Sequence, residues 1–394
     1  MSITYKTDIC IIGGGISGLW LLNAVQQEGF NSLLLEKNLL GGAQTLASQG
    51  MIHGGIKYTL GGFTTPASES IATMPEIWKD CLSGNGAIDL RSVKQLADAY
   101  YLFSDGSLSS RVTSFFGSRS IRSRVTRVAK DEYPEPFSDP GFNGWLYQLQ
   151  DIVLDTTSLV RTLQYQSNNT AFCNDARLVT NERGKLSHID LGNNERLEAD
   201  LYVLAAGAGN LGLLHDAGTE SIKMQERPLH QVMVCSEKLP PIFAHAVNLR
   251  SANKPRITFT THSTKDGLPV WYLGGNLAET GVQRDEGEQI DFAKKELGSL
   301  FPFLDLSAAQ WATLKINRAE PAQTEKTRPD YPFFKSIDNV LVCWPTKLTL
   351  VPMMVDEILS RLPSLLGTPR QTRTSALPNL PLATVGHAPW EILF

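Results

Sequence analysis

The residues most able to do chemistry stand near the beginning of the sequence, in a glycine-rich turn. The apolar run over residues 8–12 predicts a buried strand. A G-x-G-x-x-G pattern follows at Gly13, Gly15 and Gly18 and opens a segment with helical spacing. Such glycines turn the chain sharply, let the backbone approach a pyrophosphate and let the helix pack on the sheet. Because the unpaired N–H groups of the helix would face the phosphates, this segment predicts dinucleotide binding.

An acidic residue completes this pattern. A second buried strand, residues 32–35, ends at Glu36, where a carboxylate can accept hydrogen bonds from a ribose diol. The alternative is a glycine-rich turn in an unrelated α/β unit, but strand, helix, strand and acid stand in the order that dinucleotide binding requires. The contacts predicted in this part are Gly13, Gly15, Ile16, Ser17, Gly18, Glu36 and Lys37.

Two further segments favour FAD over NAD as the dinucleotide. Residues 41–58 are rich in glycine and other small residues, and a flavin ring must lie against closely approaching backbone. Residues 199–205 indicate a buried strand that ends in small residues, where another loop can meet the cofactor. The contacts predicted from these segments are Gln44, Thr45, Ala47, Ser48, Gln49, Gly50, Ala206 and Gly207.

These segments together resemble the D-amino-acid oxidase superfamily of FAD-dependent oxidoreductases, over roughly residues 5–370. The local motifs are most similar to those of FAD-dependent glycerol-3-phosphate dehydrogenase and L-2-hydroxyglutarate dehydrogenase. His53 opens a His-Gly-Gly-Ile-Lys-Tyr motif that is similar to the His-Gly-Gly-Leu-Arg-Tyr of glycerol-3-phosphate dehydrogenase. Lys347, Leu348 and Thr349 are similar to part of its Gly-Lys-Leu-Thr-Thr, and the resemblance implies that they contact FAD. It also places Leu178 behind the adenine.

Two positions depart from the pattern of that family. The last expected flavin strand, residues 339–343, is followed by Trp-Pro-Thr at 344–346 rather than by a glycine-rich turn. Lys57 stands where glycerol-3-phosphate dehydrogenase has an arginine, so the charge is kept but two-point binding of a phosphate is lost. Glycerol 3-phosphate is therefore not assigned as the substrate.

The resemblance implies hydride transfer from a substrate carbon to flavin N5, assisted by a base and by a cation that holds an anionic substrate. His53 is predicted as the base or as the group that polarises the substrate; the alternatives are a histidine that holds backbone or a covalent link to the flavin. Non-covalent FAD is the prediction. Arg318 is predicted to anchor a carboxylate or phosphate, unless it forms an ion pair with Glu320. Lys347 is predicted to stabilise the reduced flavin or touch the substrate, unless it is an ordinary loop lysine.

Four further side chains are candidates for substrate binding. Lys57 and Tyr58 could hold the anionic end of a substrate; the alternative is a solvated lysine beside a packed tyrosine. His262 and Tyr272 fall on the strands expected to form the substrate-binding sheet; the alternative is that both belong to its core or its edge.

Positioning these residues requires two domains that interleave in the sequence. The predicted fold class is α/β: a Rossmann-type FAD-binding domain, with a parallel sheet and helices, interleaved with an α+β substrate domain built on an antiparallel sheet. The FAD-binding domain is expected from residues 1–75, 146–219 and 329–367. The substrate domain is expected from residues 76–145 and 220–328. Residues 368–394 form a tail that is loop-like or docked as an extended strap.

Some elements of these domains can be predicted in more detail. Residues 76–145 are expected to be helix-rich and then loop-like. Helices are expected over residues 158–166, 288–301 and 351–362. Residues 257–261 and 270–274 are expected to form paired strands around a turn at residues 265–267.

The composition fits a globular protein with two lobes. The chain has 394 residues, of which 42% are hydrophobic and 19% charged, and its formal net charge is −4. This balance argues against a protein built mainly to hold nucleic acid. No apolar run is long enough to span a membrane and no signal peptide is recognisable, so a cytoplasmic protein is expected. The five cysteines are far apart, which favours reduced thiols over disulfides or a metal site.

One stretch departs from this average. Basic residues gather between 111 and 130 without an acid, and apolar residues alternate with them. The stretch could contact the inner face of a membrane or a large anionic substrate, and the alternative is a solvated pair of helices beside the active-site entrance. The basic residues are Arg111, Arg119, Arg122, Arg124, Arg127 and Lys130.

Three classes of function remain open at this point. The leading one is an FAD-dependent dehydrogenase or oxidase that acts on CH–OH or CH–NH of a small anionic substrate, with oxygen or a quinone as electron acceptor. The second is a flavoenzyme that modifies a macromolecule such as tRNA or a protein, which only the basic stretch supports. The third is a non-catalytic flavin-binding factor, which the altered turn at residues 344–346 supports.

Overall fold

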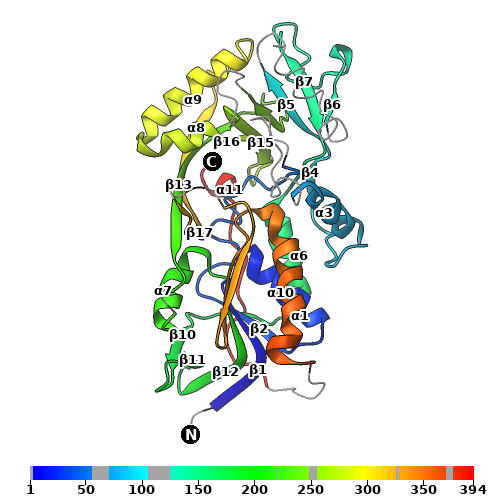
Figure 1. Ribbon diagram of the computed structural model, residues 1–394. Coiled ribbons are helices and arrows are strands. Elements are labelled where there is room, and N and C mark those ends of the chain that lie inside the picture. The colour runs from blue at the N-terminus through cyan, green and yellow to red at the C-terminus, as the bar shows by residue number, and fades with distance from the viewer. Residues whose placement is uncertain are drawn as a thin grey trace.

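The computed structural model describes residues 3–55, 71–104, 125–219, 221–247, 255–324, 327, 329–369 and 376–394. The predictions for Lys57, Tyr58 and residues 111–124 lie outside the described residues. Within them, two large sheets lie end to end along one long axis (Figure 1). The described N-terminal strand begins at the far end of the first sheet, whereas the C-terminus lies against the second sheet (Figure 1).

The first sheet has the parallel centre that the sequence predicts, whereas β10–β11, β11–β12 and β18–β19 at its edges pair antiparallel. It contains β1 (Ile3–Ile12), β2 (Ser32–Glu36), β9 (Ala171–Cys173), β10 (Arg177–Thr180), β11 (Leu186–Gly192), β12 (Glu195–Leu204), β18 (Phe333–Ile337) and β19 (Val340–Trp344). The order is β10-β11-β12-β1-β2-β9, with β19 on the C-terminal half of β12 and β18 on β19. The pairs β1–β2, β1–β12, β2–β9 and β12–β19 are parallel, as in a doubly wound sheet.

Helices cover both faces of this sheet. On one face lie α1 (Ile16–Gln27), α6 (Thr156–Gln166) and α10 (Val351–Leu366), and on the other lies α7 (Asn210–Asp216). Ile9 and Ile11 of β1 pack in the first layer, whereas Cys10 and Ile12 pack in the second. Burial on both faces is the reason why this strand has a continuous apolar sequence.

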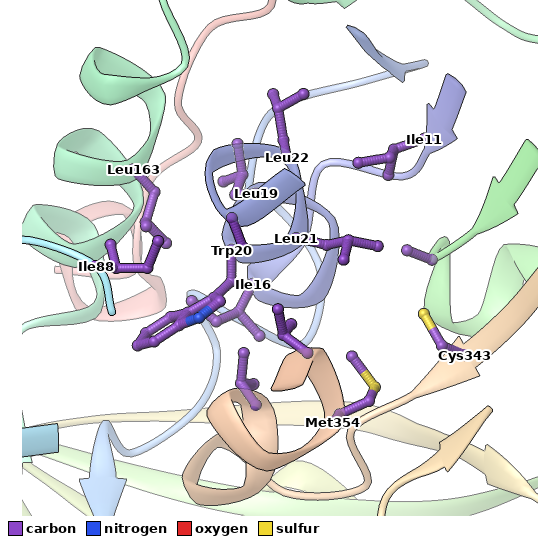
Figure 2. Close-up of a cluster of buried hydrophobic side chains, with 14 of the residues drawn as sticks. Ile11, Ile16, Leu19, Trp20, Leu21, Leu22, Ile88, Leu163, Cys343 and Met354 are labelled. Carbon is purple, nitrogen blue, oxygen red and sulfur yellow. The ribbon is translucent and has the colours of Figure 1, made fainter. Parts of the chain in front are cut away.

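Helix α1 is the centre of the larger core. Every residue from Ile16 to Val25 is buried, because α1 is covered by the sheet and by helices α6 and α10. A helix that is apolar on all sides must be covered on all sides. Figure 2 shows Trp20 and Leu21 of α1 in this core with Leu163 of α6 and Met354 of α10.

The second sheet is antiparallel except for one pair. It contains β5 (Tyr100–Ser104), β6 (Val125–Arg127), β7 (Trp145–Leu149), β13 (Met224–Cys235), β14 (Ala244–Ala246), β15 (Ile257–Ser263), β16 (Pro269–Gly274) and β17 (Gln310–Pro321). The order is β17-β13-β16-β15-β14-β5-β7-β6, and β14–β5 is the parallel pair among the described strands of this sheet. Helix α9 (Glu286–Leu300) begins with a capping box between Asp285 and Glu288 and packs on one face of this sheet through Ala293 and Leu297.

Smaller elements join the two sheets. Strands β3 (Met51–Ile52), β8 (Ile152–Leu154) and β4 (Gln95–Ala97) form a three-stranded sheet in the order β3-β8-β4. Helix α3 (Met74–Ser83) packs through Met74, Trp78 and Cys81 on the core of the first sheet. The remaining helical elements are α8 (Asn276–Thr280), α11 (Pro389–Ile392) and the 3-10 turns η2 (Lys130–Glu132), η3 (Gly207–Gly209), η4 (Gly281–Gln283) and η6 (Leu348–Leu350).

Residues 376–394, here called the C-terminal strap, are docked along the molecule. Leu40 donates its N–H to the carbonyl of Thr384, and Gly386 donates back to Leu40, at 2.8 and 3.0 Å. The strap also forms an isolated bridge between Phe172 and Leu382 at β9. It ends in α11 against the second sheet (Figure 1). Of the two predicted alternatives for the tail, a loop or a docked strap, the described residues adopt the docked strap.

Most expected elements are present. The helices expected over 158–166, 288–301 and 351–362 are α6, α9 and α10, and the expected strand pair is β15–β16, with Thr260 opposite Tyr272. The prediction that residues 76–145 are helix-rich is wrong for the described part. This part contains helix α3 and the short 3-10 turn η2, but also the strands β4, β5 and β6 and the start of β7. A helix is also wrong for Val125–Arg127, because these residues pair with β7.

The strand partners suggest how to refine the domain division. Strand β7 belongs to the second sheet, so we propose that the FAD-binding domain resumes after Leu149 rather than at residue 146. Helix α3 packs with the core of the first sheet. We therefore propose that the first segment of the FAD-binding domain, predicted as residues 1–75, extends past Ser83. The interleaved division remains a prediction. No helix in the described part of the chain combines the length and the hydropathy that a membrane span requires.

Candidate flavin and substrate site

The glycine-rich turn is shaped by the space that each glycine leaves. Gly13 has a φ of +113°, and a Cβ on it would lie 2.5 Å from the Cα of Ala206. A Cβ on Gly18 would lie 2.0 Å from the carbonyl oxygen of Gly13. By contrast, a Cβ on Gly15 would meet only Thr45 Oγ1, at 3.4 Å. Gly13 and Gly18 are therefore needed for packing, whereas Gly15 leaves room above the helix N-terminus for a phosphate.

The N-terminus of α1 presents its N–H groups to this space. Its N-cap, Gly15, has no side chain to cap the helix, and the Ile16 N–H donates to the buried Thr45 Oγ1 at 3.0 Å. Thr45 thus joins the segment after β2 to the helix N-terminus, where an anion is stabilised by the helix dipole. Ser17 is also buried in this first turn.

Glu36 is held where the ribose contact is predicted. Its Oε2 accepts a hydrogen bond from the Gly14 N–H at 2.6 Å, and its Oε1 accepts one from the Asn38 N–H at 2.8 Å. The carboxylate is thereby fixed between the end of β2 and the glycine-rich turn. This geometry, together with the room above Gly15, fits the adenosine and pyrophosphate of a dinucleotide.

The segment after Gly42 crosses from the first sheet to the second. Gln44 Oε1 accepts a hydrogen bond from the Ala319 N–H of β17 at 3.2 Å. Gln49 Nε2 donates to the carbonyl oxygens of Thr258 and Tyr272, at 3.1 and 2.8 Å. The predicted flavin contacts at 44–50 therefore lie at the junction of the two sheets, a site where an isoalloxazine would touch both.

The altered turn after β19 has a structural role. Trp344 is buried, and its Nε1 donates to the carbonyl of Gly207 at 3.0 Å. Gly207 has a φ of +57°, and a Cβ on it would lie 3.2 Å from Gln44 Nε2. The indole therefore holds the Ala206–Gly207 turn against Gln44. The altered turn therefore contacts one of the segments for which flavin contacts are predicted.

His53 lies in a turn that is held from two sides. Its backbone N–H donates to Thr349 Oγ1 at 2.9 Å, and the next N–H, of Gly54, donates to Asp151 Oδ1 at 2.8 Å. Trp78 Nε1 fixes Thr349 in turn by donating to its carbonyl at 3.0 Å. The structure thus brings together His53 and Thr349, two predicted site residues that are far apart in the sequence.

Lys347 stands at the start of the same loop. It is the N-cap residue of η6, which leads directly into α10. Its side chain is largely buried, and Nζ donates to the carbonyl of Asp330 at 3.0 Å. An ordinary solvated loop lysine would be exposed, so the burial favours a functional or structural role at this loop.

Arg318 does not form the ion pair with Glu320 that the sequence analysis gave as its alternative role. Glu320 is buried and binds Arg227, not Arg318, through two hydrogen bonds of 2.7 Å each. Arg318 lies directly opposite Arg227 in the β13–β17 pair and is 3.7 Å from Glu279. The Arg318–Glu320 alternative is therefore wrong, because Glu320 is satisfied in two-point geometry by the neighbouring strand.

His262 and Tyr272 are both buried on one face of the second sheet. The Tyr272 hydroxyl lies 2.9 Å from the Ala47 carbonyl and 2.5 Å from Gln231 Oε1. Burial lowers the pKa of His262 to about 3, so its ring is neutral at neutral pH. Trp390 of α11 stacks on this ring at 3.7 Å between centroids. His262 therefore cannot supply a positive charge to an anionic substrate, although it can form a hydrogen bond.

Sequence reasoning missed four residues of this region. Arg227 and Asp151 gave no motif, because each gains its role only from a partner distant in the sequence. Trp78 lies in a segment that was expected to belong to the substrate domain, and Trp390 lies in the expected C-terminal tail. The two-residue period of a strand was the one available signal for Arg227, since in a strand over this segment it places Arg227 and Gln231 on the same face. The remaining predicted contact, Leu178, lies in the edge strand β10.

Comparisons with known proteins identify the family of the chain. Residues 8–331 match the family model DAO, described as FAD dependent oxidoreductase. The chain is 45% identical over 390 residues to the probable FAD-dependent oxidoreductase PA4991 of Pseudomonas aeruginosa, across 99% of this chain and 98% of that protein. The crystal structure of PA4991 aligns with the whole chain at a TM-score of 0.86 and 40% identity, and all of that chain is covered.

More distant structures share the fold. Glycine oxidase from Geobacillus kaustophilus has a TM-score of 0.64 at 15% identity, over 96% of this chain and 98% of that one. L-alpha-glycerophosphate oxidase from Mycoplasma pneumoniae, a structure with FAD bound, has a TM-score of 0.66 at 14% identity, over 93% and 97%. The predicted α/β fold, the superfamily and the cofactor are confirmed. The chain belongs to the DAO family of FAD-dependent oxidoreductases.

Proposed function

We propose that this enzyme oxidises the CH–OH or CH–NH group of a small anionic substrate: a 2-hydroxy acid, a polyol phosphate or an amino acid. FAD, when bound, accepts the hydride at N5. One observation carries the proposal: residues 44–53 hydrogen-bond both to the loop at Thr349 and to the second sheet. A flavin along this segment would have a face turned to the second sheet, where charged and polar side chains are present. The proposed electron acceptor is oxygen or a quinone.

Arg318 is proposed as the anchor for the anionic group. It lies on the face of the second sheet that carries Gln231 and Tyr272, and 24% of its side chain is exposed. Arg227, directly opposite, is held tightly by Glu320. Arg318 lies 3.7 Å from Glu279 and keeps this partial exposure, and its planar donors would suit two-point binding of a carboxylate or phosphate.

His53 is proposed to take the proton from the substrate hydroxyl or amine. Its backbone is fixed by Thr349, and the adjoining turn is fixed by Asp151. A side chain on backbone held in this way has a defined position, which proton transfer requires. Lys347, which begins the loop that contains Thr349, is proposed to stabilise negative charge on the reduced flavin. We also propose that FAD is bound without a covalent link to His53.

Anaerobic reduction of the purified flavoprotein tests this function. The enzyme would be mixed with a panel of 2-hydroxy acids, polyol phosphates and amino acids, and the flavin absorbance near its visible maximum recorded. We expect at least one member to bleach the flavin and to be recovered as the matching carbonyl or imino product. Dithionite serves as the control that the flavin can be reduced. Acid precipitation of the same protein would release FAD into the supernatant if the link is non-covalent.

A negative result in this experiment has a defined meaning. If dithionite bleaches the flavin but no panel member does, oxidation of these small anionic substrates is excluded as the function. Co-purification of RNA or of a protein with such a preparation would then favour a flavoenzyme that modifies a macromolecule. The basic residues that suggested this alternative at 111–124 lie outside the described residues, so the structure adds nothing in its favour.

A further inference from the structure

The C-terminal strap pairs with the segment that follows β2. The Leu40 N–H donates to the carbonyl of Thr384 at 2.8 Å, and the Gly386 N–H donates to the carbonyl of Leu40 at 3.0 Å. Leu40 and Val385 thereby form an isolated parallel bridge. Because both backbone groups of Leu40 are bound to the strap, the position of this residue depends on the opposite end of the sequence.

Leu40 in turn packs on the glycine-rich turn. Its side chain is buried, and a Cβ on Gly14 would lie 2.4 Å from Leu40 Cδ2. The next residue, Gly41, donates its N–H to the carbonyl of Gly14 at 2.8 Å. Gly14 also donates to Glu36, the carboxylate predicted to bind the ribose. The glycine-rich turn is therefore supported by Leu40 and Gly41, and the strap holds Leu40.

The same segment reaches the N-terminus of α1. The Gly41 carbonyl accepts a hydrogen bond from the Leu46 N–H at 3.0 Å, which closes a turn that contains Thr45. Thr45 Oγ1 accepts a hydrogen bond from the Ile16 N–H. That N–H belongs to the helix end at which a pyrophosphate is expected. A displacement of Gly41 would therefore move Thr45 relative to α1.

Gly386 lets the strap lie directly on this segment. It is buried, and a Cβ on it would lie 3.1 Å from Leu46 Cδ1, 3.2 Å from the Cα of Gly42 and 3.4 Å from Leu39 Cβ. The first two distances are shorter than ordinary van der Waals contact, and the Gly42 Cα is a backbone atom. The φ of Gly386 lies outside the left-handed region, so a side chain there is opposed by the neighbouring segment and not by its own backbone.

The strap is also fixed by contacts outside this segment. The Ala383 N–H donates to the carbonyl of Ala171 at 3.0 Å, and the Cys173 N–H donates to the carbonyl of Pro381 at 2.7 Å. Gln164 Nε2 of α6 donates to the carbonyl of Ala383 at 2.7 Å. Beyond the bridge, the strap ends in α11, which contacts β15 of the second sheet. Because the strap is held on both sides, a side chain at position 386 would displace the segment after β2 rather than the strap.

We propose that the C-terminal strap positions the phosphate-binding part of the FAD site, and that Gly386 is the positioning residue through which it acts. The strap holds Leu40, Leu40 and Gly41 support the glycine-rich turn, and Thr45 binds the N-terminus of α1. Since such coupling is reciprocal, bound FAD stabilises the docked strap in return. The proposal concerns cofactor binding and does not depend on which substrate the enzyme oxidises, so it and the proposed function can fail separately.

Enlarging Gly386 tests this role. Full-length apoprotein of the wild type, Gly386→Ala and Gly386→Val would be titrated with FAD, and the dissociation constant obtained from the change in flavin fluorescence. We expect the constant to rise about tenfold or more in Gly386→Val and by a smaller factor in Gly386→Ala. Thr384→Val, a change of similar size at an exposed position of the strap, should leave the constant unchanged, because the hydrogen bond from Leu40 uses the backbone carbonyl.

Two further measurements separate positioning from a general loss of stability. Leu297→Ala in α9 removes a buried side chain from the core of the second sheet, so it should lower the urea midpoint of the apoprotein without changing its dissociation constant for FAD. ADP, which carries the adenosine and the pyrophosphate but no flavin ring, would be tested by competition with FAD. We expect Gly386→Val to weaken ADP binding by the same factor as FAD binding.

Two outcomes would overturn the proposal. In the first, Gly386→Val binds FAD and ADP with the dissociation constants of the wild type. In the second, Leu297→Ala weakens FAD binding as much as Gly386→Val does, which would make the loss an effect of stability alone. If Gly386→Val yields no folded apoprotein, the same two comparisons are made with Gly386→Ala, whose single methyl group displaces its neighbours least.

Discussion

At the scale of single residues, the site depends on what surrounds each side chain rather than on its type. Gly13, Gly15 and Gly18 share one motif, but a Cβ would collide with backbone at the first and third and would meet almost nothing at the second. Arg227 and Arg318 lie opposite one another, but a buried glutamate binds only Arg227. The residues that chemistry can use are therefore those with space or exposure left to them.

Gly18 is predicted to tolerate no side chain. A Cβ there would lie 2.0 Å from the carbonyl oxygen of Gly13, a backbone atom that cannot move aside easily. We expect Gly18→Ala to lower the free energy of unfolding by about 1–3 kcal/mol and to weaken FAD binding. Urea unfolding and the flavin content of the purified protein measure both effects. Gly298→Ala in α9 is the control, because nothing lies within 4 Å of its Cβ, and it should be neutral or slightly stabilising.

His53 is predicted to act in the chemical step and not in cofactor binding. We expect His53→Ala to slow anaerobic flavin reduction about 100-fold or more, because the substrate proton would lose its acceptor. FAD content and its visible spectrum should stay those of the wild type. His215→Ala, an exposed histidine, is the matched control. A His53→Ala enzyme that is reduced at the wild-type rate would remove His53 from the mechanism.

The lowered pKa of His262 predicts how the free energy of unfolding depends on pH. Burial lowers its pKa from 6.5 to about 3, so between these values the unfolded chain binds a proton that the folded chain does not. The contribution of the neutral ring is complete above pH 6.5. As the pH falls toward 3, the free energy of unfolding decreases by about 1.4 kcal/mol per pH unit. His262→Gln removes the group, so its free energy of unfolding should fall less steeply on acidification.

Urea unfolding of both proteins between about pH 4 and pH 7 checks this slope. His215→Gln is the control for losing a histidine that is exposed, and it should keep the wild-type slope. Equal slopes in the wild type and His262→Gln would mean that His262 can be protonated in the folded protein, and hence that the contact with Trp390 opens.

At the scale of elements, the pairing of β13 with β17 decides which charges are available. The two strands pair along their whole lengths, from Met224 opposite Pro321 to Cys235 opposite Gln310. This register puts Arg227 diagonally next to Glu320, two residues beyond its direct partner Arg318 and on the same face of the sheet. A shift of the register by one residue would turn these side chains to the other face, toward α9. The element pairing thus determines which of the two arginines Glu320 binds.

Glu320 is predicted to stabilise this pairing strongly. It is 2% exposed at its side chain and binds Arg227, which is 16% exposed. We expect Glu320→Ala to lower the free energy of unfolding by about 3 kcal/mol, because it leaves a largely buried guanidinium without its counter-charge. Glu198→Ala, which breaks solvent-accessible pairs with Lys6 and Arg196, should change it by less than about 1 kcal/mol. If the two variants prove equally stable in urea unfolding, the buried pair is not a stabilising contact.

At the scale of the whole molecule, the flavin segment and the strap both connect the two sheets, which also share packing where Ala319 of β17 enters the core of the first sheet. Gln44 and Gln49 bind the second sheet from the first, and Trp390 packs on the second sheet from a strap anchored on the first. Gln49 of the flavin segment and Trp390 of the strap both contact Tyr272. A cofactor that lies along residues 44–53 would therefore stabilise both parts at once, rather than the FAD-binding domain alone.

Removal of FAD is predicted to affect both sheets together. We expect the apoprotein to regain about 2.7 kcal/mol of unfolding free energy when FAD is restored at 100 times its dissociation constant. Hydrogen exchange should slow both in β1 and α1 and in β16 of the second sheet. Thermal unfolding and hydrogen exchange of apoprotein and holoprotein measure these effects. Protection confined to the first sheet would show that the flavin does not reach the junction.

The sequence by itself determined the FAD-binding unit. Gly13 to Glu36 predicted β1, α1 and β2 because a buried parallel strand, a glycine-rich turn and an acid at the next strand end are all local in the chain. The long helices were equally predictable, since their apolar spacing and caps are also local. The helix-rich reading of residues 76–145 was wrong in the described part because short strands such as β5 gain their stability from partners far away in the sequence.

Only the tertiary structure decided which side chains form the site. Arg227 rather than Arg318 binds Glu320, Asp151 holds the turn at His53, and Trp390 covers His262. Each of these contacts joins segments that are remote in the sequence, and no spacing rule relates them. Dinucleotide binding is encoded in contiguous residues because it uses backbone turns and a helix terminus. The side-chain contacts around the candidate site instead join separate strands and the C-terminal strap, so only the folded chain shows them.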